Sequence, residues 1–169
     1  MIGLRLCPFA KPVQVNGQID YRVSLASDEE SLSADLLSAM QALIDTPAAV
    51  TDTSLLIHPW VLQEFTEYND FLDIADALLD NAGLTGVLQI ASFHPDYRFA
   101  GTDADDVTNC TNRSPFPTLH LIREESLDKA TAALPDASEI VDRNLATFER
   151  LGHPGWAELQ QKILRAAKG

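Results

Sequence analysis

Two histidine–proline pairs are the residues of this sequence most suited to chemistry. His58-Pro59 and His94-Pro95 each follow a short apolar run, and the carboxylates Glu64 and Asp96 come soon after them. Imidazole titrates near neutral pH and is also a common zinc ligand. A pair of histidines with nearby carboxylates therefore predicts either a divalent metal site, with zinc as one possible ion, or an acid–base pair.

These side chains meet only if the surrounding elements form a sheet. Residues 53–58 and 86–93 are typical of buried strands, and apolar residues at helical spacing predict a helix over about 61–82. Parallel strands joined by a helical crossover end at the same edge of a sheet. We therefore expect His58 and His94 at one edge, with Glu64 in the apolar arc of the helix. In the alternative interpretation, His-Pro only ends each strand and Glu64 caps the helix.

A fourth predicted strand, at about 117–123, contains His120. We expect a hydrogen-bonded core histidine there, or a further metal ligand if this strand neighbours the other two. More than 20 residues precede it without regular structure. Loops of this length often cover or form a site. Arg113 in this loop is a candidate to bind an anionic substrate, or else to neutralise the aspartates around it.

Cys7 is a separate candidate, for thiol chemistry. It stands in Leu-Cys-Pro-Phe-Ala, where the proline can open a helix whose dipole activates the thiol. The motif is similar to the single-cysteine motif of some glutathione transferases and, without the second cysteine, to that of glutaredoxins. The alternative role is that of a small buried hydrophobic residue. The only other cysteine is Cys110, so no disulfide framework or zinc ribbon is indicated, and we expect a reducing cytoplasm.

The remaining pattern predicts one α/β or α+β domain over residues 1–169. A strand at 19–25 follows a possible hairpin arm at 13–15 with the turn pair Asn16-Gly17, and a helix runs from Ser27 to Pro47. Helices are expected from about 126 to 134, 136 to 152 and 155 to 167, packed on the same core. We therefore expect a mixed, mainly parallel sheet of about four strands with a helical C-terminal third.

Charge narrows the class of partner. The chain has 169 residues with 12 Lys and Arg against 25 Asp and Glu, a formal charge of −13, which disfavours nucleic acid and anionic membranes. No apolar run reaches the roughly 20 residues of a membrane span. Residues 51–110 carry 11 acidic residues and a single base, Arg98, and Asp70, Asp73, Asp76 and Asp80 share one helix face. This acidity favours a metal, or a cationic or neutral small-molecule ligand.

Several segments together resemble one bacterial family. They are GLRLCPFAKPV, TSLLIHPWVLQEF, YNDFLDIADALL, GVLQIASFHPDYRFAGT and TNRSPFPTLHLIRE. The chain is similar to members of a family catalogued as a domain of unknown function, number fourteen-fifteen, a resemblance that implies no activity.

Three hypotheses for function follow from the residues. The first is a small enzyme or metal-binding protein that acts on a small molecule through His58, His94, Asp96 and Arg113. The second is a non-catalytic binding protein whose acidic helix face and long loop meet a basic partner. The third is thiol chemistry at Cys7.

Overall fold

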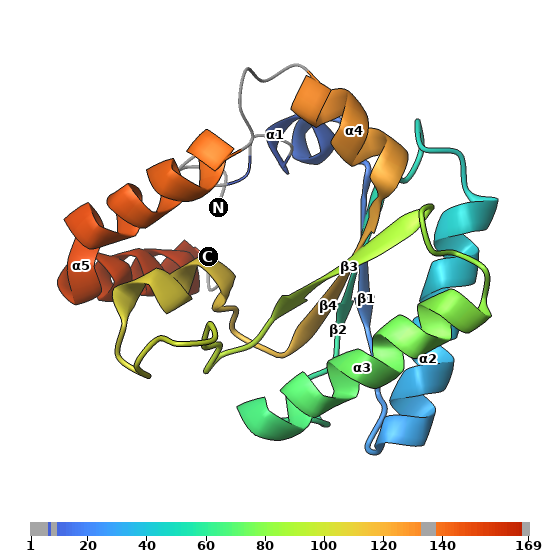
Figure 1. Ribbon diagram of the computed structural model, residues 1–169, viewed down its shortest axis with the longest axis horizontal. Helices are drawn as coiled ribbons and strands as arrows, with labels where there is room; N and C mark the ends of the chain where they lie inside the picture. Colours follow the sequence, from blue (N-terminus) through green and yellow to red (C-terminus); the bar gives the residue numbers. More distant parts are fainter. Residues whose placement is uncertain (1–6, 8–9, 133–137, 167–169) are drawn as a thin grey trace.

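A four-stranded mixed sheet forms the centre of the protein, as seen in a computed structural model (Figure 1). The structure describes residues 7, 10–132 and 138–166. The strands are β1 (Ile19–Val23), β2 (Thr53–Ile57), β3 (Leu88–Phe93) and β4 (Thr118–Arg123), in the order β1-β2-β4-β3. β1 pairs with β2 in parallel, whereas β4 runs antiparallel to both β2 and β3. The α/β class and the mixed sheet of four strands are thus confirmed.

Two long helices cover one face of the sheet. α2 (Glu29–Asp45) and α3 (Phe65–Asn81) lie side by side there and enclose the main core (Figure 1). Apolar residues of both helices meet alternate residues of the central strands, because side chains of a strand point to opposite faces in turn. The core includes Leu32, Leu36, Met40, Phe71, Leu119 and Leu121.

Shorter elements and the C-terminal helix lie on the other side of the sheet. They are α1 (Ala10–Val15), the 3₁₀ helix η1 (Val107–Asn112), α4 (Glu124–Ala132) and α5 (Ser138–Ala166). α5 is interrupted at Gly152, where the chain turns back on itself as the sequence predicts (Figure 1). Phe148 and Trp156 pack with Cys110 in a second apolar cluster. The described part of α5 therefore packs on η1, in a cluster separate from the main core.

Residues 10–15 form the helix α1, and the expected hairpin arm at 13–15 is wrong. The amide of Gly17 donates to the Gln14 carbonyl and that of Gln18 to the Val13 carbonyl, a pattern that ends a helix. Gly17 has φ +68°, which glycine adopts without strain. Asn16-Gly17 thus reverses the chain after α1 rather than between two strands.

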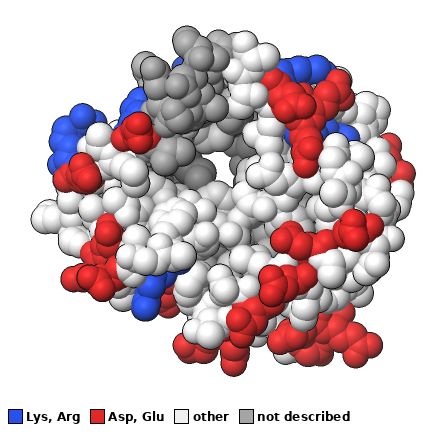
Figure 2. Space-filling view, viewed as in Figure 1, with Lys and Arg blue, Asp and Glu red and all other residues white. Residues whose placement is uncertain are grey.

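The outer face of α3 carries the predicted acidic residues. Asp70, Asp73, Asp76 and Asp80 are all exposed, and acidic side chains are frequent over α2 and α3 (Figure 2). Among the residues that the structure describes, no helix is long and apolar enough to cross a bilayer. The expected start of a helix at residue 136 lies outside the described residues.

Candidate functional site

The carboxyl ends of β2 and β3 lie at one edge of the sheet. Both strands run antiparallel to β4 between them, so they share a direction. His58 follows β2 and His94 follows β3, and both side chains are fully buried. The structure thus places the two histidines at the same edge, as the strand pattern predicts.

Tyr68 of α3 lies between the two imidazoles. Its ring centroid is 5.7 Å from that of His58 and 5.1 Å from that of His94. Its hydroxyl donates to the Thr118 carbonyl at 2.9 Å and accepts from the Phe93 amide at 3.0 Å. Burial raises the pKa of this phenol well above its ordinary value. Tyr68 therefore fastens α3 to the ends of β3 and β4 as a neutral phenol.

Both histidines hold the loop that joins β2 to α3. His58 donates from Nδ1 to the Val61 carbonyl at 3.1 Å, and His94 donates from Nε2 to the Leu62 carbonyl at 3.2 Å. The His94 Nδ1 accepts from the Asp96 amide at 3.0 Å, which fixes its tautomer. Leu62 has φ +56°, a rare conformation for a bulky residue. The loop is thus kept in a strained shape by the side chains beneath it.

Both imidazoles are disposed to stay neutral. Burial lowers the pKa of His58 to about 4. Burial also lowers the pKa of His94, although its bond to Leu62 and the carboxylates of Asp96 and Glu64 oppose that effect. Buried His58 Nε2 has no partner among the described residues. In this geometry the pair clamps a loop, and three of its four ring nitrogens are already bonded to backbone.

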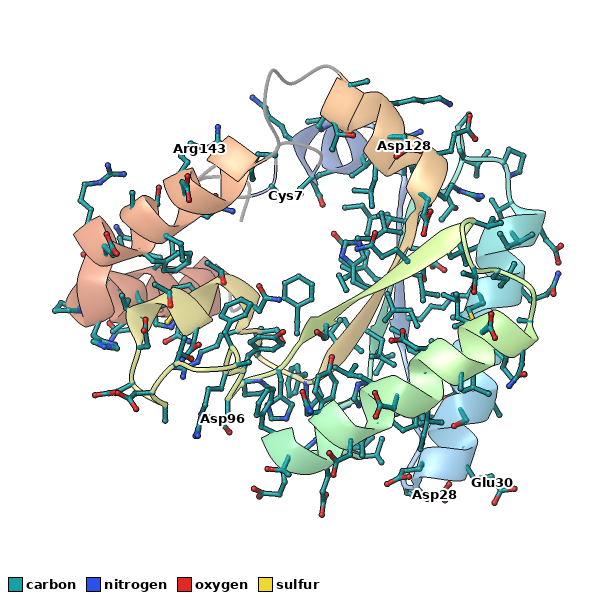
Figure 3. The ribbon with its side chains drawn as sticks, viewed as in Figure 1. Cys7, Asp28, Glu30, Asp96, Asp128 and Arg143 are labelled. Carbon is teal, nitrogen blue, oxygen red and sulfur yellow. The ribbon has the colours of Figure 1, made fainter. Side chains whose placement is uncertain are left out.

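The two carboxylates lie outside the histidine pair. α3 begins at Phe65, so Glu64 is its N-cap residue and is exposed, contrary to its expected place in the apolar arc. Glu64 makes no side-chain capping bond, whereas each His-Pro pair directly follows the last residue of its strand, Ile57 of β2 and Phe93 of β3. Asp96 is also exposed, and Figure 3 shows it on the outer side of its loop. Within the described ranges, no three His, Cys, Asp or Glu side chains are grouped closely enough to hold a metal.

The clamped loop forms one wall of a surface depression. The depression has a volume of about 480 Å³ and lies between residues 60–63 and the start of α2. Trp60 lines it and is 67% exposed, so its indole is open to a ligand. Asp28, Glu29 and Glu67 contribute carboxylates to the same lining, which holds no Lys or Arg. We call this site the Trp60 depression.

One of these carboxylates is held by the end of α2. Asp28 is the N-cap residue and accepts a hydrogen bond from the Ser31 amide at 2.8 Å. The bonds from Ser31 lower the pKa of Asp28. Asp28 is therefore ionised at neutral pH and offsets the positive end of the helix dipole. The exposed Glu29 and Glu67 add negative charge to the opening.

Arg113 is part of the internal framework of the long loop. Its guanidinium donates to the carbonyls of Tyr97 at 3.4 Å and Ala104 at 2.7 Å. Buried Asn109 accepts from the Phe99 amide at 3.0 Å and donates to the Asp103 carbonyl at 2.8 Å. The loop is therefore ordered from within around η1, and Arg113 crosslinks it.

His120 lies away from the other histidines, on the opposite face of the sheet. Its Nε2 is 2.6 Å from the hydroxyl oxygen of Thr53, and its ring centroid is 6.1 Å from that of Phe93. Burial lowers its pKa to about 4. His120 neighbours β2 and β3 in register but does not join the His58–His94 pair.

Cys7 lies near α1, well away from Asp96 (Figure 3). It is partly buried and is not in a disulfide. Its carbonyl accepts from the Ala10 amide at 3.3 Å. The structure does not bring Cys7 together with His58 or His94, so thiol chemistry there stays a separate prediction.

Three residues with a role in these sites are absent from the candidates that the sequence predicts. Tyr68 is visible in the sequence only as one member of an apolar helical stripe, and Thr53 only as the first residue of a strand. Trp60 follows His58-Pro59 directly, which was the available signal. The helical periodicity of the sequence does not show that the residues after Pro59 lie outside α3, which begins at Phe65.

A comparison with protein families finds one match over nearly the whole chain. The family model described as "Protein of unknown function (DUF1415)" matches residues 1–158. No curated protein and no solved structure gives a significant match to the chain. The function must therefore be argued from the geometry above.

Proposed function

We propose that the chain, which belongs to the family Protein of unknown function (DUF1415), binds a small organic cation in the Trp60 depression. The observation that carries this proposal is an exposed indole beside three carboxylates in a lining without Lys or Arg. An aromatic face attracts an ammonium or guanidinium group through its quadrupole, and carboxylates add Coulomb attraction. The ligand class is therefore a quaternary ammonium or a guanidinium compound.

Charge over the surrounding surface supports a cation. The chain carries a formal charge of −13, and much of it comes from the segment that includes Glu67 and the acidic face of α3. Such a field raises the local concentration of cations and repels anions. Asp28 remains ionised because Ser31 holds it, so the charge persists under mildly acidic conditions.

The buried histidines support a preformed site. His58 and His94 hold the carbonyls of Val61 and Leu62, and both of these residues are buried. The loop that presents Trp60 is thus anchored on its inner side. A preorganised wall lowers the entropic cost of binding.

We also infer that the protein resides in a reducing cytoplasm. Both of its cysteines, Cys7 and Cys110, are free, as is usual in that compartment.

Metal-dependent or acid–base chemistry at His58 and His94 stays a prediction that the geometry does not favour. Three of the four ring nitrogens are bonded to backbone, and Glu64 and Asp96 are exposed. The second hypothesis from the sequence, a binding protein with an acidic surface, also expects a positively charged ligand. Our proposal differs in naming the aromatic residue that receives the cation.

Choline and its neutral isostere 3,3-dimethyl-1-butanol test the proposal. The two have nearly the same shape and differ in charge. Binding is followed by the fluorescence of Trp60 in a Trp156→Phe background, since the chain has two tryptophans. We expect choline to bind measurably and the isostere to bind at least about tenfold more weakly, since cation–π and carboxylate attraction are both lost.

Matched variants locate the site. Trp60→Leu, followed by calorimetry, is expected to weaken choline binding about three- to thirtyfold. Glu67→Gln is expected to weaken it about two- to fivefold. Asp73→Asn removes the same charge from the same helix outside the depression and is the control. Equal affinity for choline and its isostere, or equal effects of the Glu67 and Asp73 changes, would overturn the proposal.

A further inference from the structure

The sheet has a second face, turned away from α2 and α3. Leu119 and Leu121 of β4 point into the main core, so the alternating residues Thr118, His120 and Ile122 lie on the opposite face. Register places their neighbours across the sheet. We call this surface the open face, and its central rows are Val23–Ile57–Thr118–Phe93 and Tyr21–Leu55–His120–Ala91.

The open face is only partly covered. Tyr21 is 57% exposed and Val23 is 61% exposed, although both are large apolar residues of a sheet. Leu55, Ile57 and Phe93 are half-buried. α5 packs on η1, and its ribbon stands away from the sheet (Figure 1). Apolar side chains in such a setting favour an apolar ligand.

His120 and Thr118 are the two polar residues of the central rows, and the Thr118 hydroxyl already donates to the Phe116 carbonyl at 2.9 Å. The Thr53 hydroxyl donates to the Leu121 carbonyl at 2.6 Å, so its oxygen is left to accept from Nε2–H of His120. This relay assigns the imidazole proton to Nε2 and leaves Nδ1 as an acceptor. The described residues offer Nδ1 no hydrogen-bond partner, and the side chain is partly exposed. His120 Nδ1 is thus a fixed acceptor, not bonded to any described residue, in the middle of a mainly apolar surface.

We propose that the open face is a second binding site, which takes a small uncharged molecule with an apolar body and one O–H or N–H group donated to Nδ1 of His120. The central rows contain no charged residue, so a charged ligand would lose its hydration there without a counter-charge. A donor matches the acceptor that Thr53 fixes. The site is independent of the Trp60 depression, which lies at the end of the sheet and carries charge.

Phenol and anisole are the probes for this site. They have similar apolar bodies, and only phenol can donate to Nδ1. Histidine ¹⁵N resonances of the wild-type chain report the position of binding and the tautomer. We expect phenol to shift the Nδ1 resonance of His120 saturably, and to bind about five- to tenfold more tightly than anisole.

Two variants separate a hydrogen bond from simple apolar packing. His120→Gln keeps a donor toward Thr53 but places no acceptor at the Nδ1 position, so the preference for phenol over anisole is expected to disappear. Thr53→Val removes the group that fixes the proton on Nε2. The ¹⁵N spectrum should then show a mixture of tautomers and a reduced preference for phenol, a result that a purely structural role of Thr53 does not predict.

Three results would overturn the proposal. The first is equal binding of phenol and anisole to the wild-type chain. The second is an absence of saturable shifts at His120 up to the solubility of phenol, with the chain shown folded by its melting curve. The third is a preference for phenol that survives in folded His120→Gln. The central rows of the open face contain no charged residue to attract choline. Failure of choline to bind in the Trp60 depression would therefore leave this proposal unaffected.

Discussion

His94 holds the main chain of Leu62 in a conformation that leucine rarely adopts. The imidazole Nε2 donates to the Leu62 carbonyl at 3.2 Å, and the Leu62 backbone has φ +56°. The same ring accepts the Asp96 amide, so one side chain joins the loop after β2 to the loop after β3. A strained backbone conformation such as that of Leu62 persists where several surrounding contacts hold it in place.

Replacing His94 by phenylalanine should therefore destabilise the protein. The aromatic ring can keep its packing against Phe65 and Tyr68, but the Leu62 carbonyl and the Asp96 amide lose their partner. We expect the free energy of unfolding to fall by about 1–3 kcal/mol, the usual cost of unpaired buried groups. Urea unfolding measures it, with exposed His153→Phe as the control. A loss no larger than that of the control would contradict the clamp.

Tyr68→Phe isolates the second buried connection. The Tyr68 hydroxyl bonds to the Thr118 carbonyl and the Phe93 amide, which face each other where β3 ends and β4 begins. Removing one oxygen leaves two backbone groups without this partner, and we expect a loss of about 2–4 kcal/mol in urea unfolding.

Tyr21→Phe is the matched control for Tyr68→Phe. It removes a hydroxyl that bonds only to Gln14 at an exposed position. Its expected cost is within about 0.5 kcal/mol. Similar losses for the two variants would mean that the buried hydroxyl has no special role.

Much of the sheet could be predicted from the sequence because its strands are short apolar runs between turn residues. The edge that joins His58 and His94 followed from strand direction alone. The start of α3 could not be predicted in this way. Helical periodicity in the sequence continues through Val61, but the bonds from the two histidines keep residues 61–62 outside the helix. A long-range contact thus overrides a local pattern.

The open face could not be predicted for a different reason. Alternation in β4 shows that His120 lies opposite the core side chains, but it does not show what lies against that face. The separation of α5 from the sheet depends on Phe148 and Trp156 packing with Cys110, a contact between distant segments. Gly17 failed as a hairpin signal because glycine ends a helix as readily as it forms a turn.

Stability should fall between about pH 6.5 and pH 4 because of two histidines. Burial lowers the pKa of both His58 and His120 to about 4 in the folded protein, whereas an unfolded histidine titrates near 6.5. Within this window the unfolded chain binds protons that the folded chain does not, so acidification favours unfolding. Each histidine contributes up to about 3 kcal/mol of loss, and the loss from these groups levels off below about pH 4.

Urea unfolding across this pH range, with wild type and His120→Gln compared, measures the effect. The variant should lose about half of the slope that the two histidines contribute, because one proton fewer is taken up on unfolding. His153→Gln, at an exposed position, is the matched histidine control. A slope that is unchanged in His120→Gln would show that His120 is protonated as readily in the folded state as in the unfolded state.

Gly152→Ala should loosen the contact between α5 and η1. Gly152 has φ 60° and ψ 178°, a combination that is essentially restricted to glycine. The new Cβ would meet only Pro154 Cδ at 3.6 Å, so the cost is backbone strain of about 1–3 kcal/mol rather than a clash. Relief of that strain requires the two halves of α5 to shift, which separates Phe148 from Trp156.

The near-ultraviolet circular dichroism of Trp156 in a Trp60→Phe background reports this shift, and urea unfolding reports the loss of stability. Gly83→Ala is the control, since Gly83 also has a positive φ of +69°, lies outside α5, and its added Cβ would meet nothing within 4 Å. The control is expected to lose stability and leave the Trp156 signal unchanged, so an equal change of that signal in both variants would contradict the link between Gly152 and the Phe148–Trp156 contact.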